Sequence, residues 1–304
     1  MYKNLTQMRF AILFILTAVI VGCGGKKPSE EAFINSLDSA ANTGPSVDVE
    51  MINGILQQIP PPLELSVMLR ESGAKYDVSM LNSIDNLSKY NTTYQKAMNL
   101  GIYGADLGFT NIFEQNQDGL DYMASIKDLA DGLSIGQFFD LETIGRLASN
   151  SDNLDSLLTI TTQNFNNINE YLQTQGRSHL SVMLMVGGWL EAMHLTCTIA
   201  QKSPGNKELN DAIGNQKIVT ELLKMILDLY AENPDLAKLG ADLAPLWDEF
   251  AKIEINVTQG ETTTKVVDGI MIVENNSVST VVISPETFNK IVSTISSVRQ
   301  KIIG

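Results

Sequence analysis

Apolar residues at helical spacing run from about residue 30 to residue 252, and proline and glycine interrupt them at short intervals. Apolar residues three and four positions apart share one face of a helix, so this pattern predicts a series of amphipathic helices. Pro60-Pro61-Pro62 is expected to end one helix, because proline lacks a backbone donor and restricts the chain. Helices are then expected at 63–71, 78–90, 92–114, 118–132, 140–150, 153–174, 178–202, 207–232 and 235–251.

The spacing of apolar residues changes after Lys252, where apolar and polar residues alternate. Such alternation is typical of a strand with one buried face. Two further runs rich in β-branched residues follow at 263–273 and 278–283. The three segments together predict a small antiparallel β-meander.

A last helix is expected from Pro285, with one continuous apolar stripe. We expect it to cover one face of the meander, because three strands alone are only marginally stable. The predicted fold is therefore mostly α. It consists of an irregular bundle of about ten helices over 30–252, followed by the meander and its terminal helix over 253–304.

The first 22 residues have the pattern of a secretory signal peptide, with Lys3 and Arg9 before an apolar run from Phe10 to Val21. At ~1.5 Å per residue this run is too short to cross a hydrocarbon core of ~30 Å. It is therefore expected to be removed rather than to remain as an anchor.

The sequence Ile20-Val21-Gly22-Cys23 resembles the lipobox of bacterial lipoproteins. That resemblance implies that Cys23 receives diacylglycerol, becomes the new N-terminus and is further acylated, for example with palmitate. Acyl chains on one residue anchor a protein without a basic patch, and 23–29 would form the lipidated tether. Gly24 stands where aspartate retains such proteins in the inner membrane, which implies the outer membrane; periplasmic and cell-surface orientations both remain open.

Acidic residues outnumber basic residues by 35 to 21, and the formal net charge is −14. A surface of this sign repels phosphate backbones, so nucleic acid is not an expected partner. Lipidation of Cys23 would leave Cys197 without a disulfide partner, so the fold must depend on core packing. Cys197 lies in an apolar helical stretch, where it is expected to be a small buried hydrophobic residue rather than a reactive thiol.

The body of the chain resembles uncharacterised outer-membrane lipoproteins of Bacteroidota. The resemblance lies in GIYGADLGFTNIFEQ at 101–115 and VGGWLEAMHL at 186–195, followed by the short strands and the terminal helix. It spans most of the mature chain, and it implies a location rather than an activity.

Glu191 and His194 are three residues apart and share one helical face, so together they could ligate a metal. The other histidine, His179, has no glutamate three residues before it, so completion of a site would need Asp106 or Glu114 from another helix. The simpler expectation is that Glu191 and His194 are hydrogen-bonded groups in or beside a buried helix.

Five glycines are expected to mark a helix crossing. They are Gly101, Gly104, Gly108, Gly187 and Gly188, and each removes side-chain bulk from a helix. We expect the two glycine-bearing helices to pack against each other there, with a ligand groove floored by backbone as the alternative.

The segment Leu180–Ala200 is long and apolar enough for a membrane span, with Glu191 and His194 as its ionisable residues. A charge near the middle of a span costs ~2.5–3.5 kcal/mol on insertion scales. A central helix of a soluble bundle is therefore the preferred interpretation.

No catalytic set is evident in the sequence. Gly132-Leu-Ser134-Ile-Gly136 matches the serine-hydrolase pattern, but a helix rather than the required strand precedes Ser134. The expected function is that of a non-enzymatic envelope lipoprotein, a helical module that binds or supports an envelope protein or glycan and needs no cofactor. The alternative is a metal- or ligand-dependent activity centred on Glu191 and His194.

Overall fold

The helices begin where capping residues and prolines allow them to begin. Thr92 and Gln95 form a reciprocal capping box at the start of α5, Thr93–Ile112. Asn233 and Ser284 accept backbone hydrogen bonds ahead of Pro234 and Pro285, which open α11 and α12. The prolines at 60–62 separate two helices. The second of these helices, α4, begins at Pro62.

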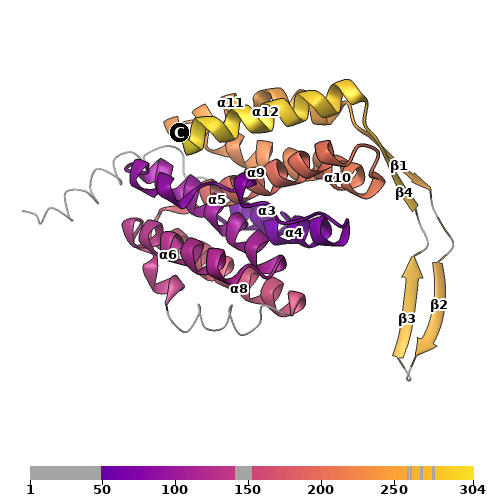
Figure 1. Cartoon of the computed structure of the whole chain (residues 1–304), viewed down its shortest axis with the longest axis horizontal. Coiled ribbons are helices and arrows are strands. Elements are labelled where there is room, and N and C mark those ends of the chain that lie inside the picture. Colours follow the sequence, from indigo (N-terminus) through magenta and orange to yellow (C-terminus); the bar gives the residue numbers. More distant parts are fainter. Residues whose placement is uncertain (1–48, 141–152, 259, 261, 268–269, 276–277) are drawn as a thin grey trace, which may run out of the picture. The chain divides into compact units, whose positions relative to one another are not determined.

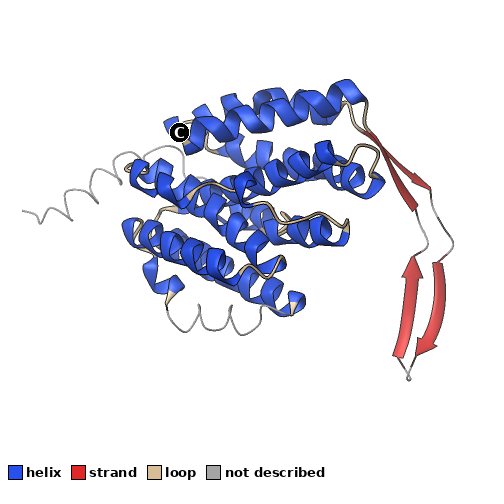
Figure 2. Cartoon of the chain, in the orientation of Figure 1, coloured by secondary structure: helices blue, strands red, loops and turns tan. Residues whose placement is uncertain are grey.

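The computed structural model describes residues 49–140, 153–258, 260, 262–267, 270–275 and 278–304. All of them belong to one unit, Gly44–Gly304. The mostly helical class is confirmed, and helices make up most of the described chain (Figure 2). The described α-helices are α3 (Val49–Leu56), α4 (Pro62–Glu71), α5 (Thr93–Ile112), α6 (Asn116–Gly132), α8 (Leu154–Thr174), α9 (Ser178–Lys202), α10 (Lys207–Leu229), α11 (Pro234–Ala251) and α12 (Pro285–Ile303), with 3-10 turns η1 (Val78–Met80), η2 (Ile84–Lys89) and η3 (Gly136–Phe139).

Helix α9 is the central element of the bundle (Figure 1). It packs against α5, α4, α12, α10 and α8, and nearly all of its residues from Leu180 to Ala200 are buried. Among the described helices it is the one long and apolar enough to cross a membrane, yet 89% of its most apolar window is buried inside the protein. A helix covered on all sides by its own chain is a core helix.

One helix predicted over 78–90 is wrong. The chain forms the short turns η1 and η2 there instead of a continuous helix. The side chains of Asp77 and Ser83 accept hydrogen bonds from backbone N–H groups two residues ahead. Such local bonds compete with helix formation, and the backbone N–H of Asn82 donates to Asp106 on α5.

The pairing of the C-terminal strands also differs from the prediction. Strand β1 (Glu254–Thr258) pairs with β4 (Val278–Val282), and β2 (Thr262–Val267) pairs with β3 (Ile270–Asn275), all antiparallel. The segment expected as one strand therefore holds two. The intervening Asp268-Gly269 is a sequence that favours tight hairpins, and it was the available signal for this division.

The terminal helix is part of the helical core rather than the cover of a separate β-domain. Its main contacts are with α11, α9 and α5. Ile291 and Ile295, from the predicted apolar stripe, are fully buried in the same core as α9. The expectation that this helix covers one face of the meander is therefore wrong, because its apolar stripe packs mainly on α11, α9 and α5.

Several predictions fall outside the described residues. The signal peptide 1–22, Cys23 with the tether 23–29, and the first part of the helix expected from residue 30 all lie before Val49. The helix expected at 140–150 also lies outside the described residues, apart from its first residue.

Candidate functional site

Three helices bring ionisable side chains together in the core. Asp106 comes from α5, Glu191 from α9 and Arg299 from α12, and all three are buried. Arg299 donates from Nε to Glu191 Oε2 at 2.6 Å and from Nη2 to Glu191 Oε1 at 2.7 Å. This two-bonded pairing is the strongest geometry available to a guanidinium and a carboxylate. We call Asp106, Glu191, His194 and Arg299 the Arg299 cluster.

Asp106 is the second carboxyl group of the cluster. Burial, followed by the charge of Glu191, raises the pKa of Asp106 well above its usual range. Its Oδ2 accepts from the backbone N–H of Asn82 at 3.2 Å, whereas its Oδ1 has no donor among the described residues. A proton on Asp106 satisfies both facts, because a protonated carboxyl group can donate to Glu191. One cation then balances one anion in the cluster.

His194 lies at the edge of the same cluster and is half-buried. Burial lowers its pKa despite the nearby carboxylate of Glu191, so its ring is neutral at physiological pH. The ring hydrogen-bonds the backbone of Met80, whose carbonyl also accepts from Arg299 Nη2 at 3.3 Å. His194 therefore helps to fix the segment before η2.

The sequence offered Asp106 or Glu114 as a third partner for Glu191 and His194, and the structure brings Asp106 to Glu191. The sequence missed Arg299. Both oxygens of Glu191 are bound by the guanidinium, which occupies the place a metal ion would need. Within the described ranges, no three His, Cys, Asp or Glu side chains are grouped to hold a metal. Glu114 lies elsewhere and pairs with Arg70 at the surface. The cluster is built as a structural contact between helices.

A polar stripe on α5 extends this contact to the C-terminus. Asn99 Nδ2 donates to the carbonyl of Ile302 at 3.3 Å, and Asn82 Nδ2 donates to Asn99 Oδ1 at 3.2 Å. Tyr122 donates to the carbonyl of Asn82 at 2.8 Å. Asn99 stands seven residues before Asp106, and this spacing was the signal that could have predicted a shared polar face.

The expected helix crossing is present between α5 and α9, at three of the five glycines. A Cβ on Gly101 would overlap the carbonyl oxygen of Leu184 and would lie 2.7 Å from the backbone nitrogen of Gly188. A Cβ on Gly187 would overlap the carbonyl oxygen of Met98. The two backbones approach so closely that no side chain fits between them.

Gly104 and Gly108 lie away from the crossing. A Cβ on Gly104 would meet no atom within 4 Å, so the expectation that it is a packing residue is wrong. At Gly108 a Cβ would meet Leu63 Cδ1 at 2.9 Å, which is the end of a flexible side chain. Both residues instead line a cavity, as the groove alternative proposed.

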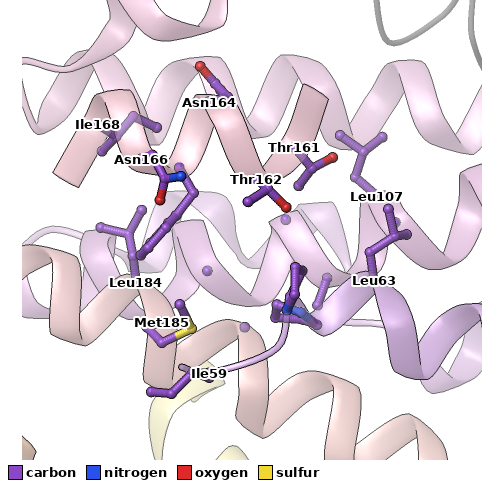
Figure 3. Close-up of a pocket in the computed structure, with 18 of the residues that line it drawn as sticks. Ile59, Leu63, Leu107, Thr161, Thr162, Asn164, Asn166, Ile168, Leu184 and Met185 are labelled. Atoms are coloured by element: carbon purple, nitrogen blue, oxygen red, sulfur yellow. The ribbon is translucent and has the colours of Figure 1, made fainter. Parts of the chain in front are cut away.

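This cavity has a volume of about 510 Å³ and lies between the α3–α4 connection, α4, α5, α8 and α9. We call it the α5–α8 cavity (Figure 3). In the close-up Thr161, Thr162, Asn164 and Asn166 come from α8 on one side. Aliphatic side chains lie around the rest of the space; they are Ile59, Leu63, Leu107, Leu184 and Met185. The cavity therefore has a hydrocarbon wall and, on α8, a border of polar side chains without charge.

Two further candidate residues have no place in a catalytic site. Ser134 is exposed just after the end of α6, with φ of 57°, and a helix rather than a strand precedes it. Cys197 is buried in α9, and burial raises the pKa of its thiol to about 12. Neither side chain has the activated environment of a nucleophile.

Comparisons with protein-family models, with curated proteins and with solved structures give no match. The function must therefore be argued from the geometry of the chain. Two features bear on the function. The charged groups of the Arg299 cluster bind one another, whereas the α5–α8 cavity is open to solvent.

Proposed function

We propose that this chain is a lipid-anchored, non-enzymatic binding module of the bacterial outer membrane. In this proposal the α5–α8 cavity takes up the apolar part of a ligand. The single observation that carries it is the cavity itself, a solvent-open space of about 510 Å³ beside the buried core of the described residues.

The size and lining of the cavity suit a ligand. Binding sites for small molecules have volumes of ~300–1,000 Å³, with mostly apolar walls and a few polar groups that orient the bound molecule. The aliphatic walls and the polar border from α8 have this composition.

The positions of the described reactive groups support the non-enzymatic part of the proposal. Among the described residues that line the cavity, Glu64 is the one ionisable residue, and its side chain is exposed. The buried acids Asp106 and Glu191 belong to the Arg299 cluster on the other side of α5. A general acid or base must reach the reacting atom within hydrogen-bond distance, and the described lining holds no pair of such groups.

Membrane attachment through Cys23 is the second part of the proposal, and it rests on the signal-peptide pattern and the lipobox resemblance of residues 1–23. Replacement of Cys23 by serine should move the protein from the membrane fraction to the soluble fraction. Cys197→Ser is the matched control, because Cys197 is buried in α9 and should not affect attachment. Membrane binding of a Cys23→Ser chain without its signal peptide would contradict lipid anchoring and would favour α9 as a span.

Ligand uptake is tested by what the protein retains. The full chain, isolated from membranes in polymer-bounded lipid patches without detergent, should carry a molecule that organic solvent extracts in stoichiometric amount. Gly104→Leu, which places a side chain in the cavity, should lose that molecule. If native chain and variant retain the same molecules in the same amounts, the cavity is not the binding site.

A further inference from the structure

We infer that the α5–α8 cavity holds one unbranched hydrocarbon chain whose headgroup is uncharged and forms hydrogen bonds, as in a monoacylglycerol. This inference rests on the proposed binding function and names its ligand class. It is carried by the length of the cavity, by the chemistry of its walls and by the charge of its border.

The cavity follows α5 along its length. It is lined by α5 residues from Leu100 to Asn111, and at Gly104 and Gly108 no side chain enters this strip. At ~1.5 Å per residue the strip from Gly101 to Asn111 spans about 15 Å. That length matches an extended chain of roughly a dozen carbon–carbon bonds of ~1.5 Å each, laid in a zigzag. A strip of this shape fits a linear chain better than a compact ring system.

The walls offer hydrocarbon contact over that length. Leu63 and Leu107 stand at one end of the close-up, and Leu184 and Met185 stand at the other (Figure 3). Flexible aliphatic and thioether side chains adapt to a chain of variable conformation. The burial of methylene groups is the dominant favourable term for such a ligand.

The border provides the groups that would bind a polar head. Thr161, Thr162, Asn164 and Asn166 line the cavity from successive turns of α8. In the described part of the chain their side chains form no hydrogen bond with other residues. Hydroxyl and carboxamide groups both donate and accept, so they match the hydroxyl groups of a glyceryl head.

The charge of the described border disfavours an anionic head. Among the described residues that line the cavity there is no lysine, arginine or histidine, and Glu64 is the one charged residue. A carboxylate or phosphate at this border would lack a cationic partner, and the chain as a whole has a net charge of −14. An uncharged head avoids this penalty.

Photocrosslinking tests the ligand class directly. The probe is a monoacylglycerol with a dodecyl-length chain and a diazirine near its end, added to the full chain in phosphatidylcholine vesicles. Crosslinks should map to peptides of α5, α8 and α9. Unlabelled dodecanoylglycerol should compete, whereas dodecanoate at pH 8 should need a concentration higher by a factor of about ten or more, because its buried charge is unpaired.

Two glycine variants separate cavity binding from general effects. Gly104→Leu should abolish the crosslink, because its side chain enters the cavity. Gly54→Leu is the matched control, because Gly54 is also an exposed helical glycine with no atom within 4 Å of an added Cβ, but it lies outside the cavity. Melting temperatures of both variants verify that each is folded.

A border variant tests the headgroup. Thr162→Val combined with Asn166→Leu should remove the preference for dodecanoylglycerol over dodecane, whereas Gln163→Leu on α8, outside the cavity lining, should keep it. Equal competition by dodecanoate or by dodecyltrimethylammonium would overturn the inference about the head, while the binding function would stand. A crosslink that Gly104→Leu leaves intact would overturn the inference and the cavity site together.

Discussion

One side of α5 carries Asn99, Tyr103 and Asp106 into a packed polar core, whereas the opposite side carries Gly101, Gly104 and Gly108. With 3.6 residues per turn, each set of three falls within one face of the helix, and the two faces lie about half a turn apart. The same helix therefore borders both the Arg299 cluster and the α5–α8 cavity.

The difference between the two sides shows where chemistry-bearing residues are a poor guide to function. The polar side holds the acids that suggest a metal or catalytic site, yet those groups bind one another and leave no space. Among the described residues, the glycine side borders no buried ionisable group, yet it borders the space to which we assign a ligand. Polar groups whose hydrogen bonds are all satisfied within the protein help to specify a fold. An open apolar pocket is the usual form of a ligand-binding site.

The largest effect is expected from Arg299→Met, which removes the cation of the Arg299 cluster. The variant leaves the carboxylate of Glu191 buried without a cation, and loss of one partner of a buried pair costs ~3–5 kcal/mol. The free energy of unfolding in urea measures this loss. Lys301→Met is the control on the same helix, because its pair with Asp242 is largely exposed and contributes ~0–1 kcal/mol.

A second variant distinguishes a structural cluster from a functional one. Replacement of Asp106, Glu191 and Arg299 together by apolar residues of similar volume should restore most of the lost stability, because well-packed hydrophobic residues often replace buried ion pairs without loss. Ligand retention should survive in this triple variant. Loss of retention in a folded triple variant would mean that the two sides of α5 act together.

A smaller effect is expected when alanine replaces single glycines of α5. Gly101→Ala drives a methyl group against the backbone of Leu184 and Gly188, and overpacking of this kind costs ~1–3 kcal/mol. Gly104→Ala meets no neighbour and gains helix propensity, so it should be neutral or stabilising by up to ~1 kcal/mol. Thermal unfolding of the two variants measures the contrast. Equal melting temperatures would show that the helices do not cross at Gly101.

Much of the helical layout could be predicted from the sequence because its determinants are local. Proline and glycine breaks and the period of apolar residues were enough to place helices such as α9 and α11. The pairing of the two glycine-bearing helices was also within reach, because side-chain bulk decides how closely helices approach. The division between β2 and β3 was missed although Asp268-Gly269 marks it, since the β-branched residues on both sides were treated as one run.

The candidate site was only partly predictable because its partners are distant in sequence. Arg299 lies 108 positions from Glu191, and nothing in the spacing of either residue indicates the other. The role of Gly104 depended on whether Thr162 and its neighbours on α8 would fill the space opposite. Small residues predict that something approaches closely, but they do not tell whether it is a helix or a ligand.

The smallest effect concerns pH, and it tests the proton assigned to Asp106. The pKa of Asp106 is raised in the folded state by burial and then by Glu191, so its stabilising contribution is full below its unfolded pKa of ~3.9 and is lost as pH rises through the folded value. Burial lowers the pKa of His194, so its contribution is full above ~6.5 and is lost as pH falls. As pH rises, the stabilising contribution of Asp106 decreases and that of His194 increases, so the two contributions change in opposite directions.

Asp106→Asn and His194→Gln should therefore change the pH dependence in opposite directions. Unfolding free energies measured from pH 4 to pH 8 should give a flatter profile for the native chain than for either variant. The stability of Asp106→Asn relative to the native chain should increase with pH, because asparagine keeps the neutral form that the folded protein prefers. The stability of His194→Gln relative to the native chain should increase as pH falls. A difference profile for Asp106→Asn that stays level across this range would mean that Asp106 is ionised in the fold, and that the cluster carries a buried charge which Arg299 does not balance.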